Sequence, residues 1–460
     1  MTSTAMRGDA WPAVTQRGLP PGPRSAPIVQ ALHLWLRPIA FVEECRRRYG
    51  EAFTLRVPGF VAEVHFSDPE AIREIFTADA EDLRAGEANV IIEPLLGAHS
   101  LLLLDGPRHL RQRRLLLPPF HGERMQAYGE TMRDITDREI ASWPIGRSFP
   151  IRRAMQRITL DVILRTVFGV DDGPLLATVR ARIERLLAVG TNPTILLPSL
   201  RRDLGPLSPW GRLVRARREV HDILAAEIAR RRAPGAPARD DVLSLLVAAR
   251  DENGSPMPDD DLRDQMMTLL FAGHETTATA LAWAFYRILQ RPDVLAAIRA
   301  EHRRVVGGGP FRAEHVARLE YLDATVKEAL RLDPIIPDVG RRLVRPMPIG
   351  GWELPAGVIA APSIHLTHRR PDRWPEPELF RPDRFLGARP GPYDFLPFGG
   401  GVRRCLGMAF ALYEMKVVLA RVLSRVELRV VPGYRARPVR RNVTLAPSRG
   451  MPVEAAARVV

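Results

Sequence analysis

The feature that most constrains the fold is a helical pattern, unbroken by proline, that runs from Asp259 to about Gln290. Asp259, Asp260 and Asp261 are expected to supply its N-cap and an acidic first turn. At 1.5 Å per residue, roughly thirty residues make a helix of about 45 Å. We therefore expect this helix to cross a whole domain.

The middle of this helix is unusual, because Ala272 to Thr277 read Ala-Gly-His-Glu-Thr-Thr. Glycine costs about 1 kcal/mol in a helix interior, and adjacent threonines add strain. The hydroxyl of Thr276 can donate to the carbonyl of Ala272 and open the helix locally, which would leave a groove for dioxygen. A simple kink in a buried helix is the alternative. We expect His274 to be structural, with its side chain pointing away from the face of Gly273 and Thr276.

A second unusual segment, Phe398 to Gly407, reads Phe-Gly-Gly-Gly-Val-Arg-Arg-Cys-Leu-Gly and precedes another helical pattern. A sulfur at a helix N-terminus beside arginines has a lowered pKa, so Cys405 is predicted to be a metal ligand or a nucleophile. The glycines allow the backbone to lie close to a flat ligand such as a porphyrin. The alternative is a buried structural cysteine beside a glycine turn.

The spacing F-x-x-G-x-R-x-C-x-G resembles the haem-ligating loop of the cytochrome P450 superfamily, in its soluble bacterial type. The resemblance implies that Cys405 is the axial thiolate ligand of haem b, with Phe398 and Gly407 beside the cofactor. Ala272 would also contact the haem. Glu275 and Thr276 resemble the family's acid–alcohol pair, which implies that they relay the protons needed for O–O cleavage.

Further motifs follow the family's order. Glu328 and Arg331 lie three residues apart, and with Arg384 they resemble a Glu-Arg-Arg triad, read as a buried structural network. A solvated surface pair is the default alternative. The cations that the resemblance assigns to the haem propionates are His109 and Arg113, in an H-x-x-x-R pattern, together with Arg341 and Arg403. The choice between Arg341 and Arg342 stays open.

The fold class expected is mainly α with small β-sheets (α+β), the cytochrome P450 fold. A proline-rich tail, 1–25, would precede one large haem domain, 26–460. Helical periodicity is predicted at 38–49, and strands at 52–57, 61–66, 341–361 and 426–458. The first two strands are expected to pair across a turn at Pro58-Gly59. With only two cysteines, no disulfide framework is plausible, and Cys45 is expected to be a bystander in an apolar environment.

The net charge of +14 could suit nucleic acid or a membrane, but arginines are spread along the chain among acids. No basic run interleaved with aromatics occurs, so nucleic acid is not expected as a partner. Charged residues in 1–18, and His33 and Arg37 within 28–42, argue against a signal peptide or transmembrane anchor. A cytoplasmic protein is expected.

The resemblance implies a haem-thiolate monooxygenase that uses O2 to hydroxylate or epoxidise an apolar small molecule, such as a fatty acid, terpenoid or polyketide. The chain lacks the length for a flavin domain and a four-cysteine set for an iron–sulfur cluster, so electrons would come from a ferredoxin or flavodoxin with its reductase. A peroxide-dependent haem-thiolate enzyme and a non-enzymatic haem sensor or carrier are the alternatives. By position, the residues expected to line the substrate pocket are Val90, Ile91, Phe271, Ala272, Ile335, Ile336, Val339 and Leu445. The segment 173–220, with Leu186, Leu187 and the apolar run 195–197, is expected to form the lid of this pocket.

Overall fold

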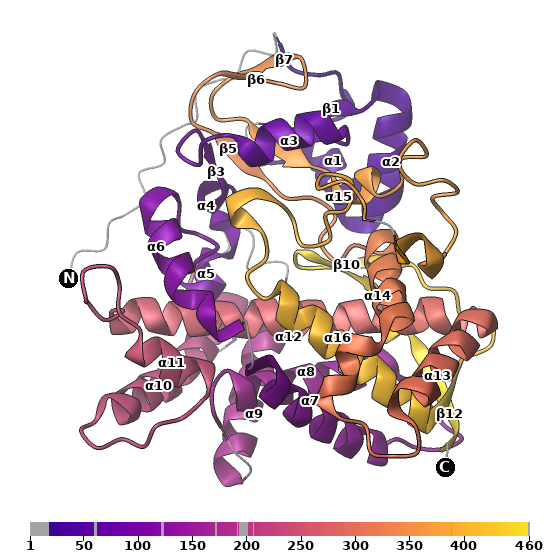
Figure 1. Ribbon diagram of the computed structural model, residues 1–460. Coiled ribbons are helices and arrows are strands. Elements are labelled where there is room, and N and C mark those ends of the chain that lie inside the picture. The colour runs from indigo at the N-terminus through magenta and orange to yellow at the C-terminus, as the bar shows by residue number, and fades with distance from the viewer. Residues whose placement is uncertain are drawn as a thin grey trace.

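The long helix α12, Asp259–Leu289, crosses the full width of the protein in this computed structural model (Figure 1). The structure describes residues 18–58, 62–120, 124–170, 173–190, 192, 201–205, 207–387 and 389–458. The prediction of a single helix of about thirty residues is confirmed. The predicted N-cap is wrong: Pro258 occupies that position without a side-chain cap, and the three aspartates form the acidic first turn. They therefore act through the helix dipole.

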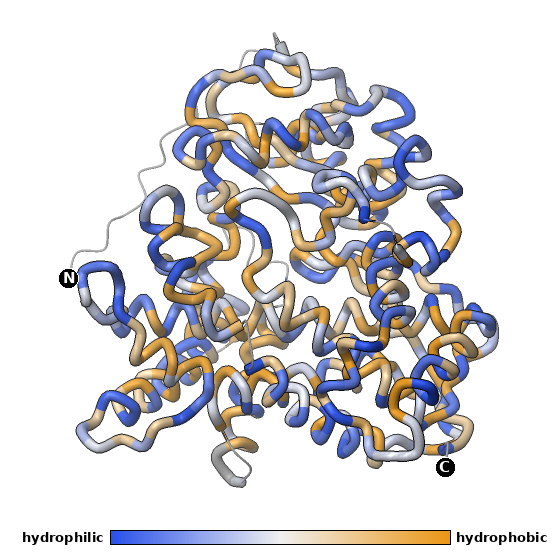
Figure 2. The backbone as a smooth tube through the Cα atoms, in the orientation of Figure 1, coloured by the Kyte–Doolittle hydropathy of each residue, from blue (hydrophilic) through white to orange (hydrophobic). Residues whose placement is uncertain are grey.

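The other helices pack around α12 or cover the sheets, and apolar segments follow α12 and its neighbours through the interior (Figure 2). The predicted helix at 38–49 is confirmed as α2. The bounds are α1 Pro27–Leu36, α2 Pro38–Tyr49, α3 Pro69–Thr77, α4 Ala85–Ala88, α5 Glu93–Leu96, α6 Gly106–Leu116, α7 Arg124–Ala141, α8 Ile151–Thr166, α9 Pro174–Gly190, α10 Pro209–Arg232, α11 Val242–Ala248, α13 Pro292–Val306, α14 Glu320–Leu332, α15 Ile364–Thr367 and α16 Met408–Arg425.

The described residues form four small sheets, and the two larger ones join segments that are far apart in the sequence. The largest has the strand order β1-β2-β8-β5-β3, in which β2 and β8 run parallel. A three-stranded sheet has the order β4-β12-β9, and β6-β7 and β10-β11 are two-stranded. The bounds are β1 Ala52–Leu55, β2 Glu63–Phe66, β3 Leu83–Arg84, β4 Ser148–Pro150, β5 Arg341–Leu343, β6 Met347–Ile349, β7 Trp352–Leu354, β8 Ile359–Pro362, β9 Val426–Val430, β10 Pro438–Arg441, β11 Thr444–Pro447 and β12 Pro452–Arg458.

All strands except β3 and β4 lie where the sequence predicts strands, and the mainly helical fold class with small sheets is confirmed. The antiparallel pairing of β1 with β2 was also expected. The turn proposed between them at Pro58-Gly59 lies partly outside the described residues. The pairing of β2 with β8 joins strands about 300 residues apart, which alternation of polar and apolar residues cannot predict.

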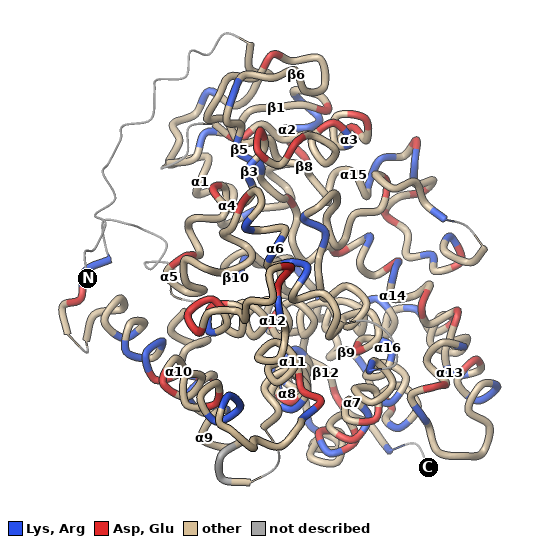
Figure 3. Tube along the Cα trace, turned by 60° about the vertical axis from the view of Figure 1, so that its left-hand side comes forward, with Lys and Arg blue, Asp and Glu red and all other residues tan. Residues whose placement is uncertain are grey.

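Charged residues of both signs are mixed over the surface (Figure 3), in agreement with the sequence-based expectation that arginine is not gathered in one patch. Among the described residues, no helix is long and apolar enough to cross a membrane. Cys45 is buried in a small core with Phe41 and Phe53, and burial raises its pKa to about 11. The Cys45 thiol is therefore protonated and unreactive, as expected of a residue with no role in the chemistry.

Candidate active site

The loop that carries Cys405 is a tight turn pressed against the end of α3. The Cys405 N–H donates to the carbonyl of Phe398 at 2.9 Å, which closes the turn. Gly401 has a φ of 63°, and a Cβ there would collide with the carbonyl of Phe76. Glycine is required at this position both for its left-handed backbone and for the close approach.

Cys405 is not at the helix terminus that the sequence suggested. Helix α16 begins at Met408 and Gly407 is its N-cap, so the sulfur precedes the helix by three residues. Burial raises the pKa of the Cys405 thiol, and this effect exceeds the opposing effects of the Gly407 N–H, Arg113 and Arg404. The expectation of a lowered pKa in the protein alone is therefore wrong, because desolvation outweighs the nearby positive charges.

Accessible surface lies inside the protein near this loop. The Cys405 side chain is exposed although the surrounding protein raises its pKa. A Cβ on Gly407 would meet nothing within 4 Å. Ala272 is exposed in the middle of α12, between the buried residues Leu270 and His274, and α12 packs against α16. These observations indicate an internal opening between the cysteine loop and the central helix.

Arginine and histidine side chains from three segments meet beside this loop. His109 and Arg113 lie on α6, Arg341 on β5 and Arg403 in the turn Gly401–Arg403. Burial and then the charges of Arg403, Arg113 and Arg341 lower the pKa of His109 to about 3. The His109 ring is therefore neutral and lies among three guanidinium groups. Arg113 and Cys405 are also close enough for their charges to interact.

The arginines of this group differ in their partners. Arg403 pairs with Asp105 and donates to the carbonyl of Leu101 at 3.1 Å. Arg341 is only 8% exposed, donates to the carbonyl of its neighbour Gly340, and lies over the ring of Phe76. Burial, and then Arg403, lower the pKa of Arg341 to about 10.

Strand β5 places the side chains of Arg341 and Arg342 on opposite faces of the sheet. This distinguishes the two residues, which the sequence alone could not do. Arg342 forms an ion pair with Glu87 at 3.0 Å, whereas Arg341 is close enough to Arg403 and Asp105 to feel their charges. Successive side chains on a strand point to opposite faces. Only Arg341 therefore belongs to the group beside the cysteine loop.

The centre of α12 contains the back-bond that the sequence suggested, within a helix that is continuous from Asp259 to Leu289. The Thr276 hydroxyl donates to the carbonyl of Ala272. Gly273 has a second role that sequence reasoning missed, because a Cβ there would lie 2.8 Å from Cδ1 of Ile163 on α8. His274 is buried, and burial lowers its pKa to about 4. Glycine thus permits close packing of α12 on α8.

The carboxylate of Glu275 is held by α8. It forms an ion pair with Arg152 and accepts a hydrogen bond of 2.8 Å from Nε2 of Gln156. Arg152 also donates to the hydroxyl of Thr279 at 3.4 Å. Sequence reasoning missed both α8 partners, since each is about 120 residues from Glu275 and neither belongs to a recognisable motif.

The three residues of the predicted triad are in contact. Glu328 and Arg331 are fully buried and share two hydrogen bonds of 2.7 and 2.9 Å. Nε of Arg384 donates to the same carboxylate at 3.1 Å, and so does the Arg381 N–H at 2.9 Å. The solvated surface pair considered from sequence is therefore not what the structure contains.

His368 connects this triad to the cysteine loop, and no sequence signal marked it. Arg331 donates to the carbonyl of His368, while the Leu396 N–H donates to Nε2 of the same ring at 2.7 Å. Burial holds the pKa of His368 well below its usual value. With Nε2 accepting, Nδ1 carries the proton and donates to the carbonyl of Arg331 at 3.1 Å. Leu396 lies two residues before Phe398, so the triad positions the start of the loop.

The predicted pocket residues fall into separate groups. Ile335 and Leu445 are adjacent, because the Leu445 N–H donates to the carbonyl of Ile335 at 2.8 Å. Phe271 lies near Gly190 at the end of α9. Val339 packs against the core of the five-stranded sheet. Of the others, Val90 is exposed, and Ile91 and Ile336 are half-buried. In the expected lid, Leu186 is buried and Leu187 half-buried, whereas 195–197 lie outside the described residues.

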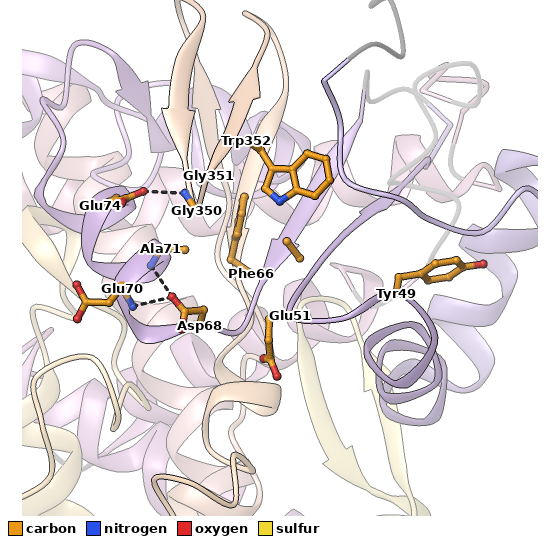
Figure 4. Close-up of a pocket in the computed structure, with 11 residues that line it drawn as sticks. Tyr49, Glu51, Phe66, Asp68, Glu70, Ala71, Glu74, Gly350, Gly351 and Trp352 are labelled. Carbon is orange, nitrogen blue, oxygen red and sulfur yellow. Dashed lines mark hydrogen bonds between the residues drawn. The ribbon is translucent and has the colours of Figure 1, made fainter.

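A surface groove of about 490 Å³ lies elsewhere, between the N-terminal half of α3 and the β6–β7 turn (Figure 4). Its walls include Trp352 and several carboxylates. Glu51 already pairs with Arg46, Glu70 pairs with Arg73, and Glu74 accepts from the Gly350 N–H. The groove is therefore distinct from the cysteine loop, which contacts the opposite end of α3, and its acids have partners.

Comparison with known proteins agrees with this geometry. The family model described as Cytochrome P450 matches residues 20–452. Proteins of Mycobacterium tuberculosis named cytochrome P450 135B1 and 135A1 are 44% and 38% identical, and each match covers 94% of this chain and at least 90% of the relative. Neither name includes a substrate.

Two solved structures also match along nearly their whole length. A retinoic acid-bound cyanobacterial CYP120A1 has a TM-score of 0.84 at 28% identity, covering 96% of this chain and 99% of its own. A cytochrome P450DA haem domain has a TM-score of 0.81 at 26% identity, covering 95% and 97%.

Proposed function

The chain belongs to the cytochrome P450 family and is a P450 monooxygenase that uses haem, O2 and an external source of electrons; we propose that it inserts oxygen into an apolar small molecule with Cys405 as the haem ligand. The observation that carries this proposal is that an accessible thiol lies beside a group of arginines, of which Arg341 is buried and Arg113 and Arg403 are half-buried. Arg113 links the two, because its charge acts on both Cys405 and His109.

The residues beside the loop fit haem b. Haem has two carboxylates, and the group of Arg113, Arg341 and Arg403 has more positive charge than Asp105 can balance. A buried guanidinium needs an anionic or hydrogen-bonding partner, and arginine suits carboxylates. Cys405 would supply the thiolate. The positive charge of the iron would offset the free-energy cost of burying this negative charge. When bound, the haem would supply activation of dioxygen.

The roles proposed for this chain's own residues follow from α12. The Thr276 hydroxyl, which donates to the Ala272 carbonyl, would hold and pass a proton. Glu275 would bring protons from the solvent side, and to do so its carboxylate must exchange its hydrogen bonds with Arg152 and Gln156. Acid–base groups of this kind contribute roughly 10²- to 10⁴-fold to a rate.

An apolar substrate is supported by the apolar side chains proposed to line the site, among them Phe271, Ile335 and Leu445. The retinoic acid bound to one structural relative is an isoprenoid acid of this general kind. A fatty acid, terpenoid or polyketide remains the proposed class. The proposed electron donor is a ferredoxin or flavodoxin with its reductase, and the proposed location is the cytoplasm.

The ligand assignment is tested with two cysteine variants. Cys405→Ser should lose the carbon monoxide difference spectrum of thiolate-ligated reduced haem, whereas Cys45→Ala, the matched control, should retain it. A thiolate-type spectrum in Cys405→Ser would contradict the assignment.

The reaction type is tested by turnover of a panel of lipophilic compounds. Product that requires reduced ferredoxin or flavodoxin supports the monooxygenase. Product formed only with peroxide would indicate the peroxide-dependent alternative, and haem binding without any product would indicate a sensor or carrier.

A further inference from the structure

Helix α1 (Pro27–Leu36) has the reverse of the usual polarity of a surface helix. Its one fully buried side chain is polar: Gln30 donates to the carbonyls of Pro23 and Ser25 at 3.1 and 2.7 Å and accepts from the Arg56 N–H at 2.8 Å. Surface helices normally bury their apolar stripe and expose the polar one. Helix α1 is therefore attached to the protein through this amide and, on the same inward side, through Leu34, which packs against the small core of Phe41 and Cys45.

The outward side of α1, here called the α1 face, is a stripe of large apolar side chains. At about 100° per residue these positions span an arc of about 120°. The exposed fractions are 67% for Ile28, 38% for Val29, 52% for Leu32, 37% for Trp35 and 66% for Leu36. An exposed apolar cluster of this kind indicates an interaction surface.

The neighbours of the α1 face differ in charge: helix α2 carries Glu43 and Glu44 as well as arginines, whereas the β10–β11 hairpin carries arginines and no acid. Helix α1 contains no charged residue (Figure 3), and 18–42 has Arg24 and Arg37 but no Asp or Glu. Arg37 pairs with Glu44 of α2. The β10–β11 hairpin packs against α1, and Nε of Arg440 donates to the Leu34 carbonyl at 3.3 Å.

The β10–β11 hairpin adds further exposed apolar and basic residues next to the α1 face. Arg441 and Val443 at its turn are exposed, and 433–453 contains five arginines and no acid. An apolar stripe edged by arginines in acid-free segments matches the composition of surfaces that lie in the headgroup region of a bilayer. Basic residues near such a surface are attracted to anionic lipids.

We propose that the α1 face docks on an anionic phospholipid surface. The convex stripe of one short helix offers no groove for a peptide, whereas a bilayer accepts isolated apolar side chains along such a helix. The surface continues into the elements proposed to bind substrate: Asn442 donates to the carbonyl of Gly190 at the end of α9, and β11 carries Leu445. Docking there would present the protein to apolar molecules dissolved in the membrane, and this last point rests on the proposed function.

The test is flotation of the haem-loaded full chain with two kinds of vesicle, pure phosphatidylcholine and phosphatidylcholine mixed with phosphatidylglycerol. The double variant Leu32→Glu/Leu36→Glu is compared with Leu379→Glu/Leu386→Glu, which changes two other exposed leucines and the net charge equally. We expect binding to the phosphatidylglycerol vesicles to fall at least ten-fold in the first variant only. Brominated lipids should also quench Trp35, and this quenching should be lost in Trp35→Phe.

Four results would overturn the proposal. These are no binding to either vesicle, equal loss in both double variants, self-association without vesicles that Leu32→Glu/Leu36→Glu abolishes, or vesicle binding only after residues 1–17 are removed. The last two would identify a second copy or the chain's own N-terminal segment as the occupant. Haem absorbance checks that the variants fold. Flotation involves no turnover, so its failure is distinguishable from failure of the proposed function.

Discussion

Replacement of Glu328 by glutamine should destabilise the protein strongly, because it strands a buried positive charge. The carboxylate is fully buried and accepts from Arg331 and Arg384 at 2.7 to 3.1 Å. Whichever oxygen becomes an NH2 group then faces a guanidinium donor. Breaking a buried ion pair from one side costs about 3–5 kcal/mol.

This cost converts to a measurable shift of the thermal midpoint. At about 2.1 cal/mol/K per residue, a chain of 460 residues has an unfolding entropy of about 1 kcal/mol/K. The midpoint should therefore fall by about 3–5 °C in Glu328→Gln, measured by circular dichroism. Glu70→Gln is the matched control, since Glu70 and Arg73 form an exposed pair with the same three-residue spacing, and no measurable shift is expected. Equal shifts in the two variants would refute the reasoning.

Other predictions concern the active site and pH. Thr276→Ala should lower the product formed per O2 consumed by about ten-fold or more and raise peroxide release, measured with an oxygen electrode and a peroxide assay; unchanged coupling would argue against its proton role. Arg341→Gln should weaken haem retention about ten- to hundredfold, followed by transfer of haem to apomyoglobin, whereas Arg342→Gln, which removes the ion pair with Glu87 on the other face of β5, should not. The folded-state pKa of His274 is about 4, so the unfolded chain binds its proton first as the pH falls below about 6.5. Stability should therefore decrease from about pH 6.5 to 4, by up to about 1.4 kcal/mol per pH unit from this residue, and urea unfolding of His274→Leu should show a shallower slope; an identical slope would refute the assignment.

Local patterns predicted the local features of this fold. The Thr276 back-bond, the length of α12 and the positions of all strands except β3 and β4 follow from spacing, propensity and alternation within short windows. The partners of Glu275 could not be predicted, because Arg152 resembles many other arginines and its position depends on how α8 packs on α12.

The pKa of the thiol in the cysteine loop depends on how deeply the thiol is buried as well as on the charges of neighbouring residues in the sequence. Adjacent arginines suggested a lowered pKa for Cys405, but burial dominates in the folded protein. Burial is a property of the whole chain, so a window around residue 405 does not contain it. For the same reason the choice of Arg341 over Arg342 required the strand to be placed.

The three-stranded sheet has a consequence for biosynthesis. Among the described residues, its strand β4, Ser148–Pro150, pairs with β12, Pro452–Arg458, which is synthesised about 300 residues later. The edge of β4 therefore stays unpaired during the synthesis of those residues, and the sheet can close only after β12 has left the exit tunnel. Such long-range pairing slows folding and leaves the nascent chain open to aggregation. Stop codons a few residues before β12 should consequently yield insoluble chains, even though they leave every residue proposed for catalysis in place.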